Sequence, residues 1–299
     1  MTSGASAPQD RRVATIHGPS LHVRDWTPAD AESPPVVCLP GLSRPLEDFT
    51  ELAEHLASPE GGGRRVLAIS ARGRGLSDRD PDPKRYDVTV ETGDILTVLD
   101  ALGVGRAILV GTSRGGMQAM MLAAIRPSVV AGIVLNDIGP VIEPDGLIRI
   151  RDYLKERAAP RNWREATDAV AALMAERFTA LGSTDFERIA RRTWRQEGHE
   201  FVALADPALV RTFEGLDLTK PLPPLWTLFD ALAATPLMAI RGSASDILSA
   251  ETFAAMRARR PDMAAIEVPG EGHAPQLADR PTFDAIAAFV AEVAARERA

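Results

Sequence analysis

The chain of 299 residues contains a single cysteine, Cys38. Without a second cysteine it cannot form an intrachain disulfide or a cysteine-based zinc cluster. Cys38 lies in the apolar run Pro35 to Leu39, where we expect a buried and inert thiol. The scarcity of cysteine therefore argues against redox and thiol chemistry.

The sequence also lacks an excess of basic residues and any long apolar run. Its 34 Lys and Arg residues are outnumbered by 41 Asp and Glu residues, which gives a net charge of −7. Proteins that bind nucleic acid neutralise phosphates with basic side chains, so we expect no nucleic-acid partner. No run reaches the roughly 18 apolar residues of a membrane span, and the first residues show no signal-peptide pattern. We expect a cytoplasmic protein without membrane contact, as a monomer or a homodimer.

Short apolar runs alternate along the chain with amphipathic patterns of helical period. The first two segments, Val13 to His17 and Leu21 to Trp26, flank Gly18-Pro19 and predict an antiparallel hairpin. Continuous runs typical of buried parallel strands follow at Val36 to Leu39, Arg65 to Ser70, Ala107 to Val110, Val129 to Leu135, Pro236 to Ile240 and Ala264 to Val268. Helices are expected over Leu46 to Ala57, Val88 to Leu102, Ala250 to Arg259 and Pro281 to Arg296. The alternation predicts an α/β fold with a mostly parallel, eight-stranded sheet flanked by helices.

Residues 141–224 differ in character from the rest of the chain. Strand-like runs vanish there, and capped helical patterns take over. The segment ends at Pro221 to Pro224, a stiff linker. We therefore expect a core made of residues 1–140 and 225–299 and a helical cap, or lid, made of residues 141–224. Some aromatic side chains in or near this segment should line a pocket; the candidates are Tyr153, Trp163, Phe178, Trp194 and Trp226.

A serine lies at the apex of a predicted strand, sharp turn and helix. The run Ala107 to Val110 leads into Gly111-Thr112-Ser113-Arg114-Gly115-Gly116, and a helical pattern follows at once. A turn this tight places its apical residue in a strained backbone conformation and leaves room only for neighbours without a Cβ atom. Ser113 is therefore the candidate nucleophile.

Candidate partners for Ser113 follow the ends of other strands. Asp246 and His273 each come after a separate predicted strand, and the carboxyl ends of parallel strands open onto one crevice. A histidine removes the proton of a serine when a carboxylate orients the imidazole. We predict a triad of Ser113, His273 and Asp246. Asp137 also follows a strand end and is the alternative acid.

Four motifs in this order resemble the α/β-hydrolase family, and in particular its esterase-like members with a cap, over about Val13 to Val293. They are Arg72-Gly73-Arg74-Gly75-Leu76-Ser77, Gly111-Thr112-Ser113-Arg114-Gly115-Gly116, Arg241-Gly242 to Asp246, and Gly270-Glu271-Gly272-His273. The second is the nucleophile elbow of the family. By position, the resemblance implies that the backbone amides of Leu42 and Arg114 form an oxyanion hole.

The resemblance implies a serine hydrolase that cleaves carboxylic esters of small to medium acyl chains through an acyl-enzyme. No cofactor or metal is implied, and the expected partner is a small ester-like molecule. A lactonase or a carbon–carbon bond hydrolase acting on dicarbonyl compounds is an alternative with the same triad. Epoxide hydrolase is disfavoured because such relatives need Asp at the elbow. From another class, a non-catalytic small-ligand receptor on this fold is the alternative.

Overall fold

The computed structural model describes residues 7–16, 18–29 and 31–298. Its central sheet has eight strands in the order β1-β2-β4-β3-β5-β6-β9-β10. The strands are β1 (Gln9–Ala14), β2 (Ser20–Trp26), β3 (Glu32–Leu39), β4 (Arg64–Ile69), β5 (Ala107–Thr112), β6 (Val130–Asn136), β9 (Leu237–Gly242) and β10 (Ala264–Val268). β1 pairs antiparallel with β2, and β2 antiparallel with β4, while the remaining pairs are parallel. The predicted α/β fold with a mostly parallel eight-stranded sheet is confirmed.

The first strand is displaced from its predicted position, Val13 to His17. It runs over Gln9–Ala14, and His17 lies outside the described residues. Four consecutive polar or charged residues begin this strand, and Arg11 is bonded across the pair to Asp25 on β2. An edge strand that is held by cross-strand polar contacts shows no alternation of apolar residues. The start of β1 could therefore not be predicted from the apolar pattern.

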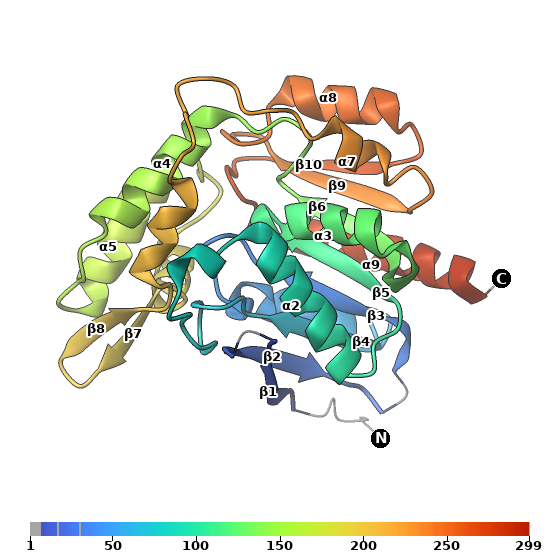
Figure 1. The fold of residues 1–299 in the computed structure, drawn as a ribbon, viewed down its shortest axis with the longest axis horizontal. Helices are drawn as coiled ribbons and strands as arrows, with labels where there is room; N and C mark the ends of the chain where they lie inside the picture. The colour runs from blue at the N-terminus through green and yellow to red at the C-terminus, as the bar shows by residue number, and fades with distance from the viewer. Residues whose placement is uncertain (1–6, 17, 30, 299) are drawn as a thin grey trace.

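Helices cover both faces of the sheet, as Figure 1 shows. One face packs against α2 (Val88–Ala101), α3 (Arg114–Ile125), α7 (Trp226–Asp230) and α8 (Ala250–Arg259). The other packs against α1 (Thr50–Ala57) and α9 (Arg280–Arg298). All seven residues of β6 are buried, because a central parallel strand has a helical layer on each side.

The chain between β6 and α7 leaves the sheet and lies to one side of it (Figure 1). Its elements are α4 (Pro144–Glu156), α5 (Trp163–Met174), α6 (Ser183–Arg191), β7 (Trp194–Glu197), β8 (Glu200–Ala203) and the 3-10 helix η4 (Pro207–Phe213). The expectation that strands are absent here is wrong, since β7 and β8 form an antiparallel hairpin. Gly198, with φ of 62°, makes its tight turn, and Trp194 and Phe201 bury one face against α5 and α6.

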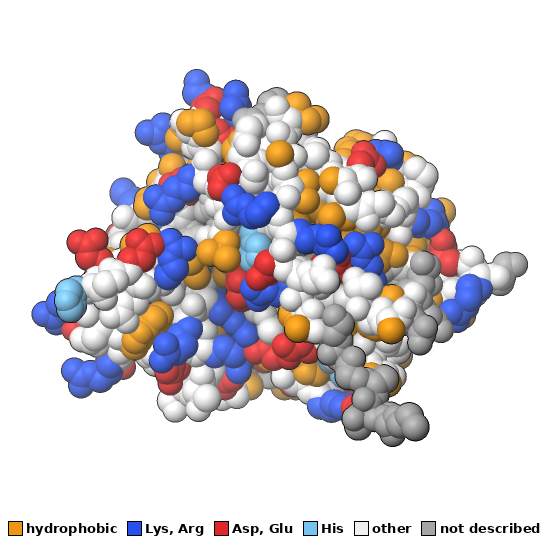
Figure 2. All heavy atoms as spheres, turned by 90° about the horizontal axis from the view of Figure 1, so that it is seen from below, with side chains coloured by type: hydrophobic (Ala, Val, Ile, Leu, Met, Phe, Trp, Pro, Cys, Tyr) orange, Lys and Arg blue, Asp and Glu red, His pale blue; other side chains and the backbone are white. Residues whose placement is uncertain are grey.

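Charged side chains are distributed over the surface without a broad region of one sign in the view of Figure 2. Basic and acidic side chains are interspersed there. Many charged residues of the protein form ion pairs, such as Arg24 with Asp10. Within the part of the chain that the structure describes, no helix is both long and apolar enough to cross a bilayer.

Candidate active site

Ser113 occupies a strained turn between β5 and α3. Its backbone has φ of 52° and ψ of −114°, outside the regions that L-residues ordinarily adopt. A Cβ atom added to Gly111 would lie 2.4 Å from the carbonyl oxygen of Gly115, and one added to Gly115 would lie 2.0 Å from that of Leu39. Only glycine fits at these positions, so the predicted elbow is present and presents the serine hydroxyl at the end of β5.

Ser113, His273 and Asp137 form a continuous hydrogen-bonded chain. The Nε2 atom of His273 lies 2.9 Å from Oγ of Ser113, and its Nδ1 atom lies 2.8 Å from Oδ2 of Asp137. The Asp137 side chain is fully buried, and it also accepts hydrogen bonds from the Gly242 amide at 2.8 Å and the Ser245 hydroxyl at 2.6 Å. These contacts hold the carboxylate on the imidazole, and the imidazole on the serine, as nucleophilic catalysis requires.

The predicted pairing of His273 with Asp246 is wrong, and the alternative acid Asp137 takes that place. Asp246 instead accepts a bidentate ion pair from Arg149 on α4, at 2.7 and 2.8 Å. Arg177 lies 3.4 Å from the same carboxylate. Burial acts to raise the pKa of Asp246, but the hydrogen bonds and charge of Arg149 hold it below its ordinary value.

The sheet order and one backbone angle explain why Asp137, and not Asp246, pairs with His273. β6 and β9 are neighbours, with Asn136 opposite Ile240, so the residues that follow both strands open onto the same crevice. Asp137 has φ of 56°, which turns its side chain towards His273. The arginines that contact Asp246, Arg149 and Arg177, belong to residues 141–224. They are so far from Asp246 along the chain that no sequence pattern predicts the contact.

Leu42 and Arg114, the residues predicted to supply the oxyanion hole, both lie in segments next to Ser113. Arg114 is the first residue of α3, so its amide has no acceptor within that helix. Leu42 follows β3 and lines the same cavity as Ser113 and His273. A Cβ atom on the adjacent Gly41 would lie 3.7 Å from Cβ of Ser113, which brings this loop into contact distance of the nucleophile.

A buried glutamate links the two segments that carry these amides. Glu91 on α2 accepts from Nε of Arg114 at 2.6 Å and from Arg74, and Nε of Arg74 donates to the carbonyl oxygen of Leu42 at 2.6 Å. Burial acts to raise the pKa of Glu91, but Arg74 and Arg114 hold it below its ordinary value. Glu91 was not among the residues predicted from the sequence, although an acidic residue at helical spacing from the apolar Ile95 and Val98 was a visible signal.

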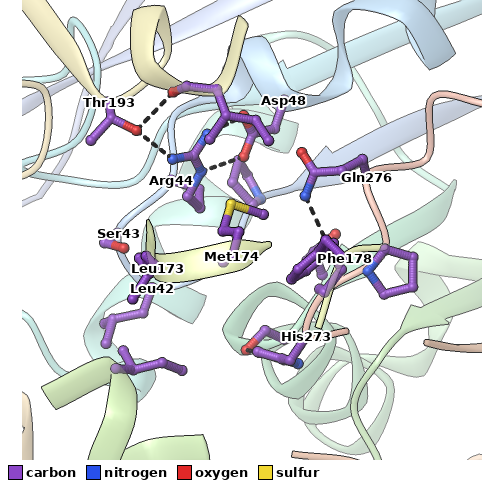
Figure 3. Close-up of a pocket in the computed structure, with 18 of the residues that line it drawn as sticks. Leu42, Ser43, Arg44, Asp48, Leu173, Met174, Phe178, Thr193, His273 and Gln276 are labelled. Carbon is purple, nitrogen blue, oxygen red and sulfur yellow. Dashed lines mark hydrogen bonds and ion pairs between the residues drawn. The ribbon is translucent and has the colours of Figure 1, made fainter. Parts of the chain in front are cut away.

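A cavity of about 150 Å³ adjoins Ser113 and His273 (Figure 3). Much of its wall is apolar, with Val170, Leu173 and Met174 contributed by α5. Of the five candidate aromatic residues, Tyr153 and Phe178 line this cavity. The three tryptophans pack elsewhere: Trp163 and Trp194 in the cluster formed by α5, α6 and the hairpin, and Trp226, the first residue of α7, against Phe229 of the same helix.

The polar side chains that line this cavity include an arginine, Arg44, which is paired with Asp48. Arg44 donates two hydrogen bonds to Asp48, at 2.6 and 2.8 Å, and a third to the Thr193 hydroxyl at 2.8 Å. Gln276 also lines the cavity. Among residues 7–16, 18–29 and 31–298, no three His, Cys, Asp or Glu side chains are grouped so that they could hold a metal ion.

The catalytic geometry and the sheet order together define a hydrolase of the α/β-hydrolase class. The model of the alpha/beta hydrolase fold family matches residues 34–278. The chain belongs to this family. A solved α/β hydrolase from Novosphingobium aromaticivorans is 36% identical, superposes with a TM-score of 0.88, and aligns over 96% of this chain and 99% of its own.

Two characterised relatives are enzymes that hydrolyse small acids or their oligomers. The 3-hydroxybutyrate-oligomer hydrolase of Cupriavidus necator is 32% identical over 89% of this chain and 90% of its own length. The 2-(acetamidomethylene)succinate hydrolase of Mesorhizobium japonicum is 30% identical over 75% of this chain and 78% of its own length. Hydrolysis is therefore the common activity of these relatives.

Proposed function

We propose that this protein hydrolyses carboxylic esters of small to medium acyl chain through an acyl-enzyme on Ser113. The observation that carries the proposal is the hydrogen-bonded chain from Ser113 through His273 to Asp137. It provides a nucleophile, a base and an acid that stabilises the imidazolium. The activity of the relative on 3-hydroxybutyrate oligomers supports the ester class, because hydroxy acids are joined in oligomers by ester bonds.

The reaction takes place in two steps that use the same histidine. Nε2 of His273 takes the proton of Ser113 as Oγ attacks the ester carbonyl, and the oxyanion accepts hydrogen bonds from the amides of Leu42 and Arg114. The tetrahedral intermediate collapses, and His273 gives the proton to the departing alkoxide, leaving an acyl ester on Ser113. Water then attacks this ester, His273 takes its proton, and the acid leaves as Oγ is reprotonated.

Residues 141–224 form the cap of this proposed enzyme. Side chains of α4, α5 and the segments after them contribute to the cavity wall beside the nucleophile. The small cavity and its apolar side chains favour a short acyl group. The substrate is accordingly a small ester that enters between the cap and the carboxyl ends of the strands.

The test is hydrolysis of p-nitrophenyl esters of increasing acyl length by the native protein and by Ser113→Ala. We expect turnover that is greatest for short chains and a loss of about 10⁴-fold or more in Ser113→Ala. Ser128→Ala, a change at an exposed serine in the turn after α3, is the matched control and should retain full activity. Turnover of lactones or dicarbonyl compounds without turnover of esters would replace the ester proposal, and binding without any turnover would favour a receptor.

A further inference from the structure

The wall of the cavity beside Ser113 carries a charged group, the guanidinium of Arg44. In Figure 3, Arg44 and Asp48 lie on one side of the pocket and His273 lies on the other, with Met174 between them. Arg44 follows β3, whereas Thr193, which accepts its third hydrogen bond, precedes the β7–β8 hairpin. A substrate whose carbonyl reaches Ser113 would thus have its acyl chain in the apolar region and its far end near Arg44.

Arg44 retains hydrogen-bonding capacity that its neighbours do not use. A guanidinium carries five N–H donors. Three of them are taken by Asp48 and Thr193, which leaves two with no acceptor among the described residues. The Thr193 hydroxyl is itself committed, because it donates to the carbonyl oxygen of Ile189. The side chain is 24% exposed, and Arg44 lines the cavity.

The fixed charges on the cavity wall belong to ion pairs. Two arginines, Arg44 and Arg149, and one carboxylate, Asp48, line it. Asp48 offsets one positive charge, and the carboxylate that pairs with Arg149 is Asp246, which is not part of the lining. Each arginine is therefore compensated by a carboxylate partner, and an incoming anion is attracted by the N–H groups that Arg44 has free rather than by a net charge of the wall.

We propose that Arg44 binds a free carboxylate of the substrate, so that the preferred esters are those whose acyl chain ends in a carboxylate. The inference rests on the proposed ester hydrolysis and specifies its substrate class. A planar guanidinium donates two parallel N–H groups to a carboxylate, and such charge-assisted hydrogen bonds are roughly twice as strong as neutral ones. Arg44 is in this sense a residue that determines specificity, and it takes no part in bond cleavage.

The test compares two esters of equal chain length, p-nitrophenyl hydrogen glutarate and p-nitrophenyl valerate. Native protein should have the higher kcat/KM for the acidic ester. In Arg44→Gln, the ratio of the two kcat/KM values should fall about 10- to 100-fold, chiefly through KM for the acidic ester. Arg257→Gln, which removes an exposed arginine on α8, is the matched control and should keep the native ratio.

Asp48→Asn separates recognition from a structural role. If Arg44 binds carboxylates, removing its competing partner should raise the preference for the acidic ester by about 3- to 10-fold. An Arg44–Asp48 pair that serves only to hold the fold predicts parallel losses on both esters in each variant, and that result would overturn the inference. The double variant Arg44→Gln/Asp48→Asn leaves neither charge unpaired and guards against misfolding.

Direct binding keeps this inference separate from the proposed function. Calorimetry with glutarate and with butyrate needs no turnover. We expect native protein to bind glutarate more tightly, and Arg44→Gln to lose that difference. Cleavage of both esters with a ratio of kcat/KM values that does not change in Arg44→Gln would refute the carboxylate site alone. Binding of glutarate through Arg44 without cleavage of either ester would refute ester hydrolysis alone, and equal binding of both acids would refute the carboxylate site.

Discussion

At the scale of single residues, His273 is positioned by groups with different tasks. Its Nδ1 atom contacts Asp137, whose carboxylate has no exposure to solvent. Asp246 acts on His273 only through its charge, since its oxygens are engaged by Arg149 and Arg177. One carboxylate orients the imidazole, and the other joins the core to α4.

Asparagine substitutions distinguish these two tasks. Asp137→Asn should lower kcat by about 10³- to 10⁴-fold, because an amide stabilises neither the required tautomer nor the imidazolium. Asp246→Asn should lower kcat by less than about tenfold and should act mainly on KM, since it loosens the contact with α4. The measurement is steady-state kinetics on one p-nitrophenyl ester. The assignment fails if Asp246→Asn shows the larger loss in kcat.

Much of the site was predictable because its parts follow strand ends. Ser113 and His273 were expected to meet, and their reacting atoms lie 2.9 Å apart. The sequence could not decide whether Asp137 or Asp246 is the acid, because both follow parallel strands whose carboxyl ends open onto the same crevice. It depends on the backbone angle at Asp137 and on an ion pair between residues 97 positions apart, Arg149 and Asp246. Neither leaves a local pattern.

At the scale of elements, α2 braces two segments around the nucleophile. Glu91 accepts hydrogen bonds from Arg114 and Gln118 of α3, and from Arg74 in the loop after β4. Arg74 in turn holds the carbonyl of Leu42 in the loop after β3. A single buried carboxylate therefore links both residues that are predicted to supply the oxyanion hole.

Glu91→Gln should loosen that geometry. A neutral amide pairs poorly with two arginines, so we expect kcat to fall about 10- to 100-fold with little change in KM. The affinity for a trifluoromethyl ketone, which mimics the tetrahedral intermediate, should fall in parallel. Arg114→Met, which keeps the backbone amide, should give a smaller loss of the same kind. A lower melting temperature with unchanged kcat and inhibitor affinity would show that Glu91 serves stability alone.

The elements themselves were predictable to the extent that burial produces a pattern. The bounds predicted for α8 coincide with those observed, because Ser249 caps its start and its buried residues recur at helical spacing. The bounds of β10 also coincide, although only Val268 among its residues is buried. The β7–β8 hairpin escaped prediction, since three of the four residues of β7 are exposed and polar. That residues 141–224 act as a cap stays a prediction, supported by their share of the cavity wall.

At the scale of the whole molecule, the antiparallel edge depends on a buried charge. Asp25 on β2 accepts from Arg11 on β1 at 3.0 Å and from Arg65 on β4, also at 3.0 Å. Burial acts to raise the pKa of Asp25, but these arginines and Thr27 hold it below its ordinary value. Elsewhere, hydrogen bonds from Arg260 lower the pKa of Asp262 to about 2.

Depressed carboxylate pKa values make the fold sensitive to acid. A group whose pKa is lower in the folded than in the unfolded chain contributes stability above its unfolded pKa of about 3.9, and this contribution is lost as pH falls through the folded value. We therefore expect the free energy of unfolding, measured with urea, to be constant near neutral pH and to fall between about pH 4 and pH 2.

Asp25→Asn tests how much of the decrease in the free energy of unfolding between pH 4 and pH 2 is due to Asp25 at the edge of the sheet. The variant should be less stable than native protein at pH 7, because it leaves Arg11 and Arg65 without their shared carboxylate. Its stability should also fall less steeply between pH 4 and pH 2, so that the two curves converge in acid. Asp168→Asn, at an exposed position on α5, should follow the native curve. Parallel curves for native protein and Asp25→Asn would mean that Asp25 supports the edge by hydrogen bonding that does not depend on its charge.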